Sequence, residues 1–466
     1  MDKKHKTKVE KLSQQVRGFY AQQKPFRVFH GSTNSTRILE FKRDELVDTS
    51  DLLTLIKLDR VHKTVIVESN MPMDTLVRTT LKHGLVPPVV PEFPGITVGG
   101  AIQGGAGESS SFKWGFFSQT VNWFEMILPD GDVVTCSPSS HSDLFYGSAG
   151  SMGTLGIITA VEIQLVEAKP YVELTFTPVH SFGTAMKTLV EATKKSHDFV
   201  DAIMFSQELG VIITGSFTQK KKGPLRRFSR AHDEWFYLHA ENITSRKVGH
   251  TETVPIKDYL FRFDRGAFWV GRFAFERFGI PYNRVSRFIL NPLLHTRELY
   301  KALQESGASQ EHIVQDLTVP VDKSVDFLQY IDSTMSIYPL WLCPVKPAPK
   351  SPLLCNGLAT TMTINVGIWG PRMENHKAFV DANKQLENKL YEYNGKKWLY
   401  AHAYYTEDEF WKIYDKNWYD ILRIKYKADY LPSIYEKTHV HKTYAINARR
   451  GLLNTMFGRA KLRVNK

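Results

Sequence analysis

Cysteine is scarce in this chain of 466 residues, and long apolar runs are missing. The three cysteines, Cys136, Cys343 and Cys355, are too few and too widely spaced for a disulfide framework or a zinc site, so we expect a reducing compartment and no metal. No run of about 18 apolar residues occurs, and we therefore expect no membrane-spanning helix. The N-terminal segment MDKKHKTKVEKL is basic and no apolar region follows it, which argues against a secretory signal. These absences predict a cytoplasmic protein.

Several motifs that would identify an enzyme class are also missing. There is no Walker A motif, which argues against a P-loop NTPase. No G-x-G-x-x-G occurs, because Ser110 stands where a third glycine should follow Gly105 and Gly107, and a Rossmann site is therefore disfavoured. H-E-x-x-H and G-x-S-x-G motifs are absent too, which argues against a zinc enzyme and an α/β-hydrolase.

Negative charge is in deficit, because 60 lysines and arginines face 48 acidic residues and give a formal charge of +12. Such a balance suits an anionic partner, for example a phosphorylated cofactor or an acidic membrane surface. The basic residues are scattered and match no nucleic-acid-binding motif, so we expect no nucleic-acid partner.

What the chain has instead is a glycine-rich window, PGITVGGAIQGGAGESSS, at residues 94–111. Glycine lacks a Cβ, so such a backbone can turn sharply and approach a ligand closely. Its free N–H groups can also point at an anion. The window therefore predicts a loop around a phosphate-bearing ligand. A flexible linker or a tight turn in a β-rich core is the alternative, although Ile96, Val98 and Ile102 alternate as core-facing residues do.

The hydrophobic patterns predict an α+β fold. Helices are expected at residues 8–23, 73–83, 181–196 and 373–393. Strands are expected at residues 26–29, 63–68, 157–166, 171–177, 211–217, 338–343 and 360–368. A hairpin is predicted at 124–135 with Pro129-Asp130-Gly131 as its turn, and a second glycine-rich turn at 143–157. The aromatic-rich residues 230–300 allow no assignment.

The tail, residues 437–466, combines basic and apolar side chains. Its composition is compatible with a basic amphipathic helix that touches acidic lipid or binds a calmodulin-like partner. A frayed, solvated terminus is the favoured alternative.

Four segments occur in a fixed order along the chain. They are HGSTNST at 30–36, TVGG at 97–100, GGAGESSSFKWG at 104–115 and DLFYGSAGSMGTLGIIT at 143–159. This order resembles the FAD-binding domain of the vanillyl-alcohol oxidase and p-cresol methylhydroxylase type. The resemblance implies that FAD is held by many neutral donors. The implied cofactor residues are Gly31, Ser32, Thr33, Asn34, Ser35, Thr36, Thr97, Gly99, Gly100, Gly104, Gly105, Gly107, Glu108, Ser109, Ser110, Ser111, Lys113, Gly115, Gly150, Gly153, Thr154, Gly156, Ile157 and Ile158.

Other segments extend the resemblance to about residues 14–437. VVPEFPGITVGG at 89–100, ESSSFKWG at 108–115, VQDLTVP at 314–320, YPLWLCP at 338–344 and YAHAYYTEDEFWKIYD at 400–415 are similar to Δ24-sterol reductases. That family implies non-covalent FAD, although some flavoproteins with this domain attach flavin to a histidine near the first loop, where His30 is the candidate. Family members commonly carry an N-terminal hydrophobic anchor, which this chain lacks, so at most peripheral attachment to the endoplasmic reticulum membrane is expected.

The resemblance also implies a division of the chain. We expect an FAD-binding domain at 8–168, a substrate or cap domain on an antiparallel sheet at 169–395, a segment closing the active site at 396–436 and the basic tail at 437–466.

The implied reaction is reduction of a sterol side-chain Δ24 double bond with NADPH. Because this alkene is isolated, we expect protonation to a tertiary cation and hydride delivery from flavin N5. A buried carboxyl or a tyrosine suits the role of proton donor. The candidates are Tyr404, which is preferred, and Tyr405, His402, Glu409 and Asp316, while Trp341, Phe410 and Trp411 are candidates to line a sterol pocket. Each is equally compatible with a packing role.

Two other functions stay open. The same fold would serve an FAD-dependent oxidase, dehydrogenase or double-bond isomerase acting on another lipid or a phenolic substrate. A protein of another class would bind lipid or calmodulin through its basic tail without catalysis.

Overall fold

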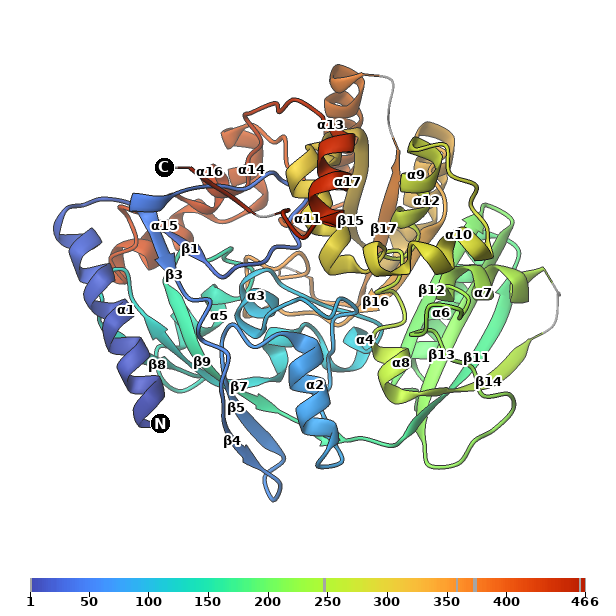
Figure 1. The fold of residues 1–466 in the computed structure, drawn as a ribbon, viewed down its shortest axis with the longest axis horizontal. Helices are drawn as coiled ribbons and strands as arrows, with labels where there is room; N and C mark the ends of the chain where they lie inside the picture. Colours follow the sequence, from blue (N-terminus) through green and yellow to red (C-terminus); the bar gives the residue numbers. More distant parts are fainter. Residues whose placement is uncertain (1, 246–248, 358, 372–374, 461, 466) are drawn as a thin grey trace.

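Two antiparallel sheets dominate the computed structural model, which describes residues 2–245, 249–357, 359–371, 375–460 and 462–465 (Figure 1). The first sheet has five strands in the order β4-β5-β9-β7-β8. Its strands are β4 (Leu55–Asp59), β5 (Thr64–Glu68), β7 (Val121–Ile127), β8 (Val133–Cys136) and β9 (Ile157–Gln164). β7 and β8 form the predicted hairpin around Pro129-Asp130-Gly131.

Helices and short strand pairs surround this first sheet. The helical elements are α1 (Lys3–Ala21), η1 (Arg43–Glu45), α2 (Met73–Leu81), α3 (Val98–Gln103), α4 (Ser111–Trp114), η2 (Phe117–Thr120) and α5 (Ser142–Ser148). The short strands are β1 (Arg27–Phe29), β2 (Glu40–Lys42), β3 (Leu46–Asp48), β6 (Leu85–Val86) and β10 (Val166–Glu167). β1 pairs with β3, and β6 pairs with β10. α1 buries Val9, Leu12 and Val16, as its spacing predicts, and begins before residue 8 because Asp2 caps it.

The second sheet has eight antiparallel strands in the order β14-β11-β13-β12-β16-β17-β15-β18. They are β11 (Tyr171–Val179), β12 (Phe199–Ser206), β13 (Leu209–Thr218), β14 (His250–Pro255), β15 (His312–Pro320), β16 (Leu340–Val345), β17 (Thr363–Pro371) and β18 (Lys396–Lys397). β12, β14, β15 and β18 were not anticipated from the sequence. The predicted α+β class and an antiparallel sheet are confirmed, whereas the division of the chain into the four expected segments stays a prediction.

Helices cover both faces of the second sheet. α6 (Phe182–Thr193), α12 (Ser324–Thr334) and α13 (His376–Glu392) pack on one face. α7 (Phe236–Thr244), α8 (Ile256–Leu260) and α9 (Val270–Arg277) lie on the other. The first residues of the helix predicted at 373–393 fall outside the described residues. Because side chains alternate across a strand, β16 sends Leu340 and Leu342 to one core and Trp341 and Cys343 to the opposite one.

The remaining elements are α10 (Arg284–Ile289), η3 (Asn291–Leu293), α11 (Thr296–Ser306), η4 (Ala308–Glu311), η5 (Val321–Lys323), α14 (Glu407–Ile413), α15 (Lys416–Lys425), α16 (Ile434–Thr438), α17 (Ala448–Met456) and β19 (Arg463–Asn465). Of these, α14, α16 and α17 lie in the upper half of Figure 1. Within the described ranges, no helix combines the length and the apolar character that crossing a membrane requires.

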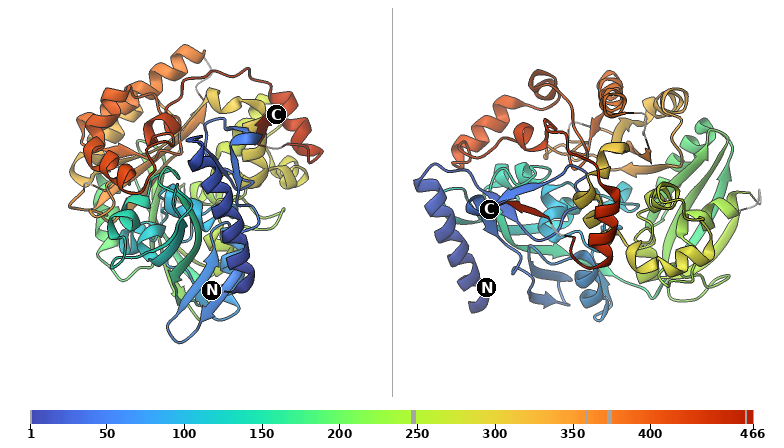
Figure 2. Two further views of the ribbon diagram at one scale, coloured as in Figure 1. Left: turned by 90° about the vertical axis from the view of Figure 1, so that its left-hand side faces the viewer. Right: turned by 45° about the horizontal axis from the view of Figure 1, so that its top comes forward.

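The tail is part of the fold, so the expectation of a solvated terminus is wrong. α17 packs along α11, and the two helices lie side by side in Figures 1 and 2. Gly451 permits this approach, because a Cβ there would lie 2.9 Å from the carbonyl oxygen of Ala302. β19 then pairs in parallel with β2 near the start of the chain.

The glycine window is also more regular than a loop. Thr97 caps α3, its Oγ1 accepting the Gly100 N–H at 3.1 Å. Gly99 sits against Ser69, whose carbonyl oxygen would lie 3.2 Å from an added Cβ. Glycine is therefore needed here for close packing rather than for flexibility. The second predicted turn likewise starts as a helix, α5, and turns only after it ends.

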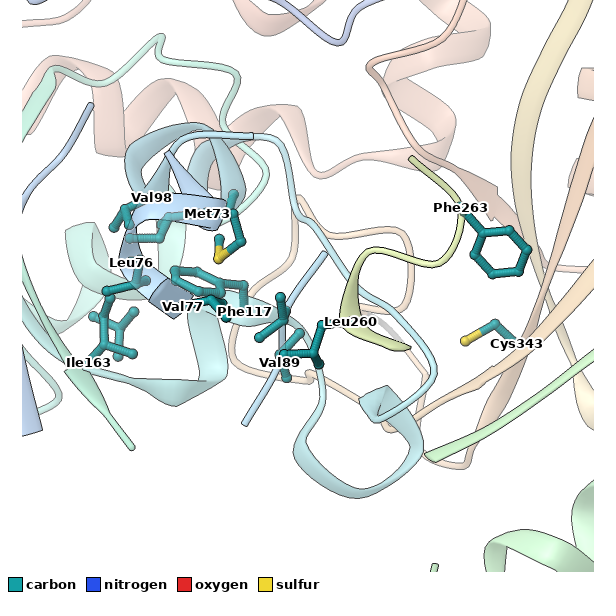
Figure 3. Close-up of a cluster of buried hydrophobic side chains, with 14 of the residues drawn as sticks. Met73, Leu76, Val77, Val89, Val98, Phe117, Ile163, Leu260, Phe263 and Cys343 are labelled. Atoms are coloured by element: carbon teal, nitrogen blue, oxygen red, sulfur yellow. The ribbon is translucent and has the colours of Figure 1, made fainter. Parts of the chain in front are cut away.

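One hydrophobic cluster joins the two sheets. Figure 3 shows it running from Met73 and Val98 past Val89 and Leu260 to Cys343 on β16. A buried polar network lies within the same junction, centred on Arg262, which is 1% exposed.

Arg262 connects the glycine window with the second sheet. Its Nη2 lies 2.8 Å from Asp201 Oδ2 on β12 and donates to Ser109 Oγ at 3.3 Å. The Trp341 indole N–H donates to the same Asp201 oxygen at 3.0 Å. The guanidinium also lies over the Tyr259 ring, 4.3 Å from its centroid. Removing it would leave a buried carboxylate without its counter-charge.

We therefore expect Arg262→Ala to lower the free energy of unfolding by about 3–5 kcal/mol, the cost of breaking a buried ion pair from one side. Denaturant titration of the purified variant measures this. The matched control is Arg272→Ala, which removes an exposed pair with Glu276 and should cost less than about 1 kcal/mol. Equal losses of unfolding free energy in the two variants would contradict the proposed contribution of the network to stability.

Candidate functional site

A cavity of about 710 Å³ opens between the glycine window and the inner face of the second sheet. Three of the predicted cofactor loops meet at its wall. The predicted cofactor residues that line it are Ser32, Thr33, Asn34, Ser35, Thr36, Thr97, Gly100, Gly104, Gly107 and Gly153. This wall is therefore rich in hydroxyls and in backbone without Cβ atoms.

Other predicted cofactor residues do not line the cavity. They are Gly31, Gly99, Gly105, Glu108, Ser109, Ser110, Ser111, Lys113, Gly115, Gly150, Thr154, Gly156, Ile157 and Ile158. Glu108 to Ser111 are buried in the network around Arg262, where Ser109 Oγ donates to Glu108 at 2.6 Å. Lys113 forms an ion pair with Asp198, and Ile157 and Ile158 are core residues. Their contact with a cofactor stays a prediction.

Positive charge without a counter-ion gathers near the first loop. Lys437 and Arg37 both line the cavity, and no carboxylate in the described part of the chain forms an ion pair with either. Burial, together with the neighbouring Arg27 and Arg37, lowers the pKa of Lys437 to about 7. Burial and Arg27 lower the pKa of Arg37 to about 9. A buried cation with a depressed pKa is stabilised when an anion binds beside it.

Arg37 is held by the closing segment of the chain. Its Nη1 donates to the carbonyl oxygens of Leu399 and Ala401, while its Nε has no hydrogen-bond partner among the described residues. Lys437 Nζ lies 3.4 Å from the carbonyl oxygen of Gly153. The residues present thus fit a diphosphate, because hydroxyl donors and two unneutralised cations face the same space. Nothing in the local sequence singled out Lys437, which was expected in a solvated tail.

His30 also lines this part of the cavity. Burial and the nearby Lys437 lower its pKa to about 4, so the imidazole is neutral near pH 7. Its contribution there is a neutral hydrogen-bonding group rather than a third positive charge.

Asp316 is the predicted proton donor that the structure brings to the cavity. It lies on β15, where alternation directs Val314 and Asp316 to the cavity and Leu317 to the opposite core. Its Oδ1 accepts from Asn365 Nδ2 at 2.8 Å, and its Oδ2 accepts from the Tyr400 hydroxyl at 2.6 Å. Burial raises the pKa of Asp316 to about 6, against the opposing effect of these two hydrogen bonds.

The other four predicted proton donors do not line the cavity, and Tyr405 packs against Phe410. His402 is buried with its Nδ1 3.0 Å from Thr36 Oγ1, and burial lowers its pKa to about 3. Tyr404 packs against Phe379 in the opposite core of the second sheet. Glu409 is exposed and caps α14, accepting the Thr406 N–H at 2.7 Å. The Tyr404 hydroxyl is buried without a hydrogen-bond partner among the described residues, and the catalytic roles of these residues stay predictions.

Aromatic rings form another wall of the cavity. Trp341 lines it as anticipated, whereas Phe410 and Trp411 pack beneath the C-terminal helices. Phe268, in the segment that resisted assignment, lies 5.3 Å from Trp341 and 4.3 Å from Trp369, centroid to centroid. Its backbone is left-handed with φ of 62°, a strained conformation for a bulky residue that surrounding packing must hold.

A second buried acid, Glu92, also lines the cavity. Its Oε1 has no hydrogen-bond partner among the described residues and lies 3.9 Å from Arg262 Nη2. Burial raises its pKa well above the ordinary value. The sequence motif that contains Glu92 was noticed, but nothing in it distinguished this carboxyl from a surface one.

Much of the remaining wall is apolar, although Arg27, Arg277 and His312 also line it. Side chains from α9, η3, α11 and α17 supply it, among them Phe273, Leu293, Leu299, Leu303, Leu452 and Met456. The cavity therefore combines a cationic, hydroxyl-rich part with an aromatic and aliphatic part that carries two buried carboxyls. Within the described ranges, no group of histidine, cysteine and acidic side chains could hold a metal ion.

Comparison with known proteins agrees with this geometry. Residues 6–137 match the family described as FAD binding domain. The chain is 30% identical to human Delta(24)-sterol reductase over 93% of its own length and 86% of the human protein. It is 31% identical to the pea Delta(24)-sterol reductase over 82% of this chain and 74% of that protein. For the Delta(24)-sterol reductase homolog of Caenorhabditis elegans, the identity is 28% over 84% and 78%. The chain therefore belongs to the Δ24-sterol reductase family of FAD-dependent oxidoreductases.

Proposed function

We propose that this protein reduces the Δ24 double bond in a sterol side chain, with non-covalently bound FAD and with NADPH as electron donor. Membership of the family supports the reaction class. The observation that carries the proposal is Asp316, a buried carboxyl with a raised pKa in the wall of an aromatic cavity. FAD, when bound, supplies the hydride from its N5.

The protein must supply a proton, because an isolated alkene has no conjugated group to accept electrons. Asp316 is the stronger acid of the Asp316–Tyr400 pair, since burial and the adjacent carboxyl raise the pKa of Tyr400 well above its usual value. An apolar ligand that displaces water would raise the Asp316 pKa further and keep the carboxyl protonated near neutrality. The neutral carboxylic acid then gives its proton to the less substituted alkene carbon. Tyr400, whose hydroxyl donates to the same carboxyl, orients it.

The cavity wall suits the cation that protonation creates. Trp341, Trp369 and Phe268 present aromatic rings, and the face of an aromatic ring attracts a positive charge. The same rings exclude water, which would otherwise capture a tertiary cation. Asn365 holds Asp316 Oδ1 from β17, so the acid keeps one orientation against this wall.

Lys437 and Arg37, with the hydroxyls of residues 32–36, are the groups that would hold the FAD diphosphate. A peripheral position on the endoplasmic reticulum membrane is part of the same proposal, and the exposed apolar side chains of α10 and α17 support attachment to a lipid surface. A calmodulin-like partner is not part of it, because α17 is already packed on α11.

Anaerobic stopped-flow spectroscopy tests the reaction as a whole. The holoenzyme is first reduced with NADPH and then mixed with a Δ24-unsaturated sterol, with its saturated counterpart as control. We expect the flavin to reoxidise only with the unsaturated sterol, and mass spectrometry to find a product heavier by two hydrogens. Absence of sterol-dependent reoxidation would contradict the proposal, and rapid reoxidation in a parallel aerobic mixing without sterol would favour an oxidase.

Asp316→Asn removes the acidic proton but keeps the size of the side chain. We expect sterol-dependent flavin reoxidation to slow about 10²–10⁴-fold, the usual contribution of a positioned general acid. Flavin content should stay at the wild-type level. Glu92→Gln is the matched control, another buried cavity acid made neutral, and should retain most of the rate. The reverse pattern would transfer the proton-donor role to Glu92.

The pH dependence of the same step follows from the Asp316 pKa. Its carboxyl is protonated below about pH 6 and ionised above, so the single-turnover rate should be highest on the acid side. The rate should fall as pH rises past the pKa of the sterol complex, which we expect at or above 6. In the Asp316→Asn variant, the single-turnover rate should not show this fall with rising pH. A flat profile for the wild-type protein would exclude a titrating carboxyl as the donor.

Lys437→Met should weaken FAD binding about 10–100-fold, because a hydrogen bond to a charged group is worth about 1.5–3 kcal/mol. Titration of apoprotein with FAD, followed by flavin fluorescence, measures the affinity without turnover. Lys427→Met is the control, since Lys427 forms an exposed ion pair with Asp130 away from the cavity wall. Unchanged affinity in the Lys437 variant would mean that the diphosphate lies elsewhere.

FAD affinity should itself depend on pH. Free Lys437 has a pKa of about 7, and a bound anion would raise it, so binding above pH 7 requires proton uptake. The wild-type affinity should therefore weaken as pH rises from 7, by at most about tenfold per pH unit. Lys437→Met should flatten this dependence. A steeper pH dependence in the variant would contradict the assignment.

A further inference from the structure

Exposed apolar side chains gather on two short helices beside the cavity. On α10 they are Val285, Phe288 and Ile289, which are 67%, 53% and 66% exposed. On α17 and the residue after it they are Leu453, Met456 and Phe457, which are 51%, 53% and 65% exposed. We call these six residues the rim. Scattered single apolar residues on a surface are ordinary, but six large ones on neighbouring elements mark an interaction surface.

The rim is continuous with the apolar wall of the cavity. Leu290 and Leu293, directly after the α10 part of the rim, line the cavity, and so does Leu452 beside Leu453. Met456 belongs to both sets, because it lines the cavity and is more than half exposed. It therefore marks the place where the cavity reaches the surface.

α11 connects the two parts of the rim. It contacts η3, which follows α10, on one side and α17 on the other. Figures 1 and 2 show the yellow helices of this region beside the red α17. Apolar side chains thus extend from the outside of α10 and α17 to the cavity wall, where Leu299 and Leu303 of α11 also lie.

The net charge of the polar residues around the rim is positive. Arg284 on α10, Arg449 on α17 and Arg459 just after it are exposed. Acidic side chains on the neighbouring elements are already neutralised: Glu305 by Arg450, Glu311 by Arg277 and Glu276 by Arg272. An apolar surface bordered by arginines is complementary to a bilayer that contains anionic lipids, because apolar side chains enter the interface while the guanidinium groups meet phosphate.

We propose that the rim docks on an anionic lipid bilayer, so that the cavity opens into the apolar layer and its ligand passes directly between membrane and protein. That the ligand is a sterol rests on the proposed function, but docking itself does not. The rim is thus an entrance for a water-insoluble substrate as well as an attachment surface.

Vesicle flotation with the full-chain, FAD-loaded protein tests this. The vesicles are phosphatidylcholine with or without a minor fraction of phosphatidylserine. The rim variant is Phe288→Ser, Ile289→Ser, Leu453→Ser and Phe457→Ser combined. Its control is Ile421→Ser with Ile424→Ser on α15, where both isoleucines are as exposed as the rim residues, at 67% and 66%. Flavin content and the thermal midpoint confirm that each variant is folded.

We expect the wild-type and control proteins to float with phosphatidylserine vesicles and the rim variant to lose at least tenfold of its bound fraction. Arg284→Gln with Arg449→Gln should remove most of the preference for phosphatidylserine. Absence of flotation by the wild-type protein, or an equal loss in the control, would overturn the proposal. A dimeric wild-type protein with a monomeric rim variant would also overturn it, because the rim would then be a protein interface.

The test separates docking from the proposed reaction. Flotation without any sterol reduction would leave docking in place and remove the proposed function. Reduction of detergent-dispersed sterol by a protein that never floats would do the opposite. If the docking and the reaction are both correct, the rim variant should lose activity toward sterol in vesicles and retain activity toward sterol in detergent.

Discussion

The ion pair between Arg262 and Asp201 is the contact on which the rest of the molecule depends. Arg262 follows α8, Asp201 lies on β12 and Ser109 belongs to the glycine window, so one guanidinium fixes the cofactor loops against the second sheet. Because these groups are buried, water cannot replace the bonds between them, and small displacements are costly. The cavity between window and sheet therefore has a defined width. Removing Arg262 would release both walls rather than one side chain.

Strand alternation then decides which residues face that cavity. On β15, β16 and β17, every second residue packs beneath α6, α12 and α13. The residues between them face the cavity, among them Asp316, Trp341 and Asn365. Both faces of these strands are buried, so a charged residue such as Asp316 on β15 is conspicuous in the sequence. Burial raises its pKa, and the hydrogen bonds from Asn365 and Tyr400 fix its direction. The position of the acid is thus a consequence of the sheet's two-residue period.

The sequence predicted the parts of the fold that depend on local pattern. Strong strands such as β5 and β9, the hairpin turn at Pro129-Asp130-Gly131 and the loop at residues 30–36 were anticipated, because propensity and turn chemistry act over a few residues. Lys437 and Phe268 were not. Lys437 reaches the cavity only because the tail folds back onto it, and Phe268 only because three left-handed residues, 266–268, turn its ring inward. Such long-range and strained placements have no local signature. Glu409 is the opposite case, since a helix cap and a functional acid look alike in sequence.

The chemical environment differs between the two ends of the cavity, and this difference favours a different ligand at each end. Cations without counter-ions, Lys437 and Arg37, face the hydroxyl-rich loops, whereas aliphatic side chains of α11 and α17 lead outward to Met456 at the surface. An anionic group is stabilised only at the first place and a hydrocarbon only at the second, so a diphosphate and a sterol would not compete for the same walls. Asp316 lies in the aromatic wall, and a hydrocarbon that displaces water beside it favours its protonated form. Binding of the sterol would therefore keep Asp316 protonated, and the sterol would then accept that proton.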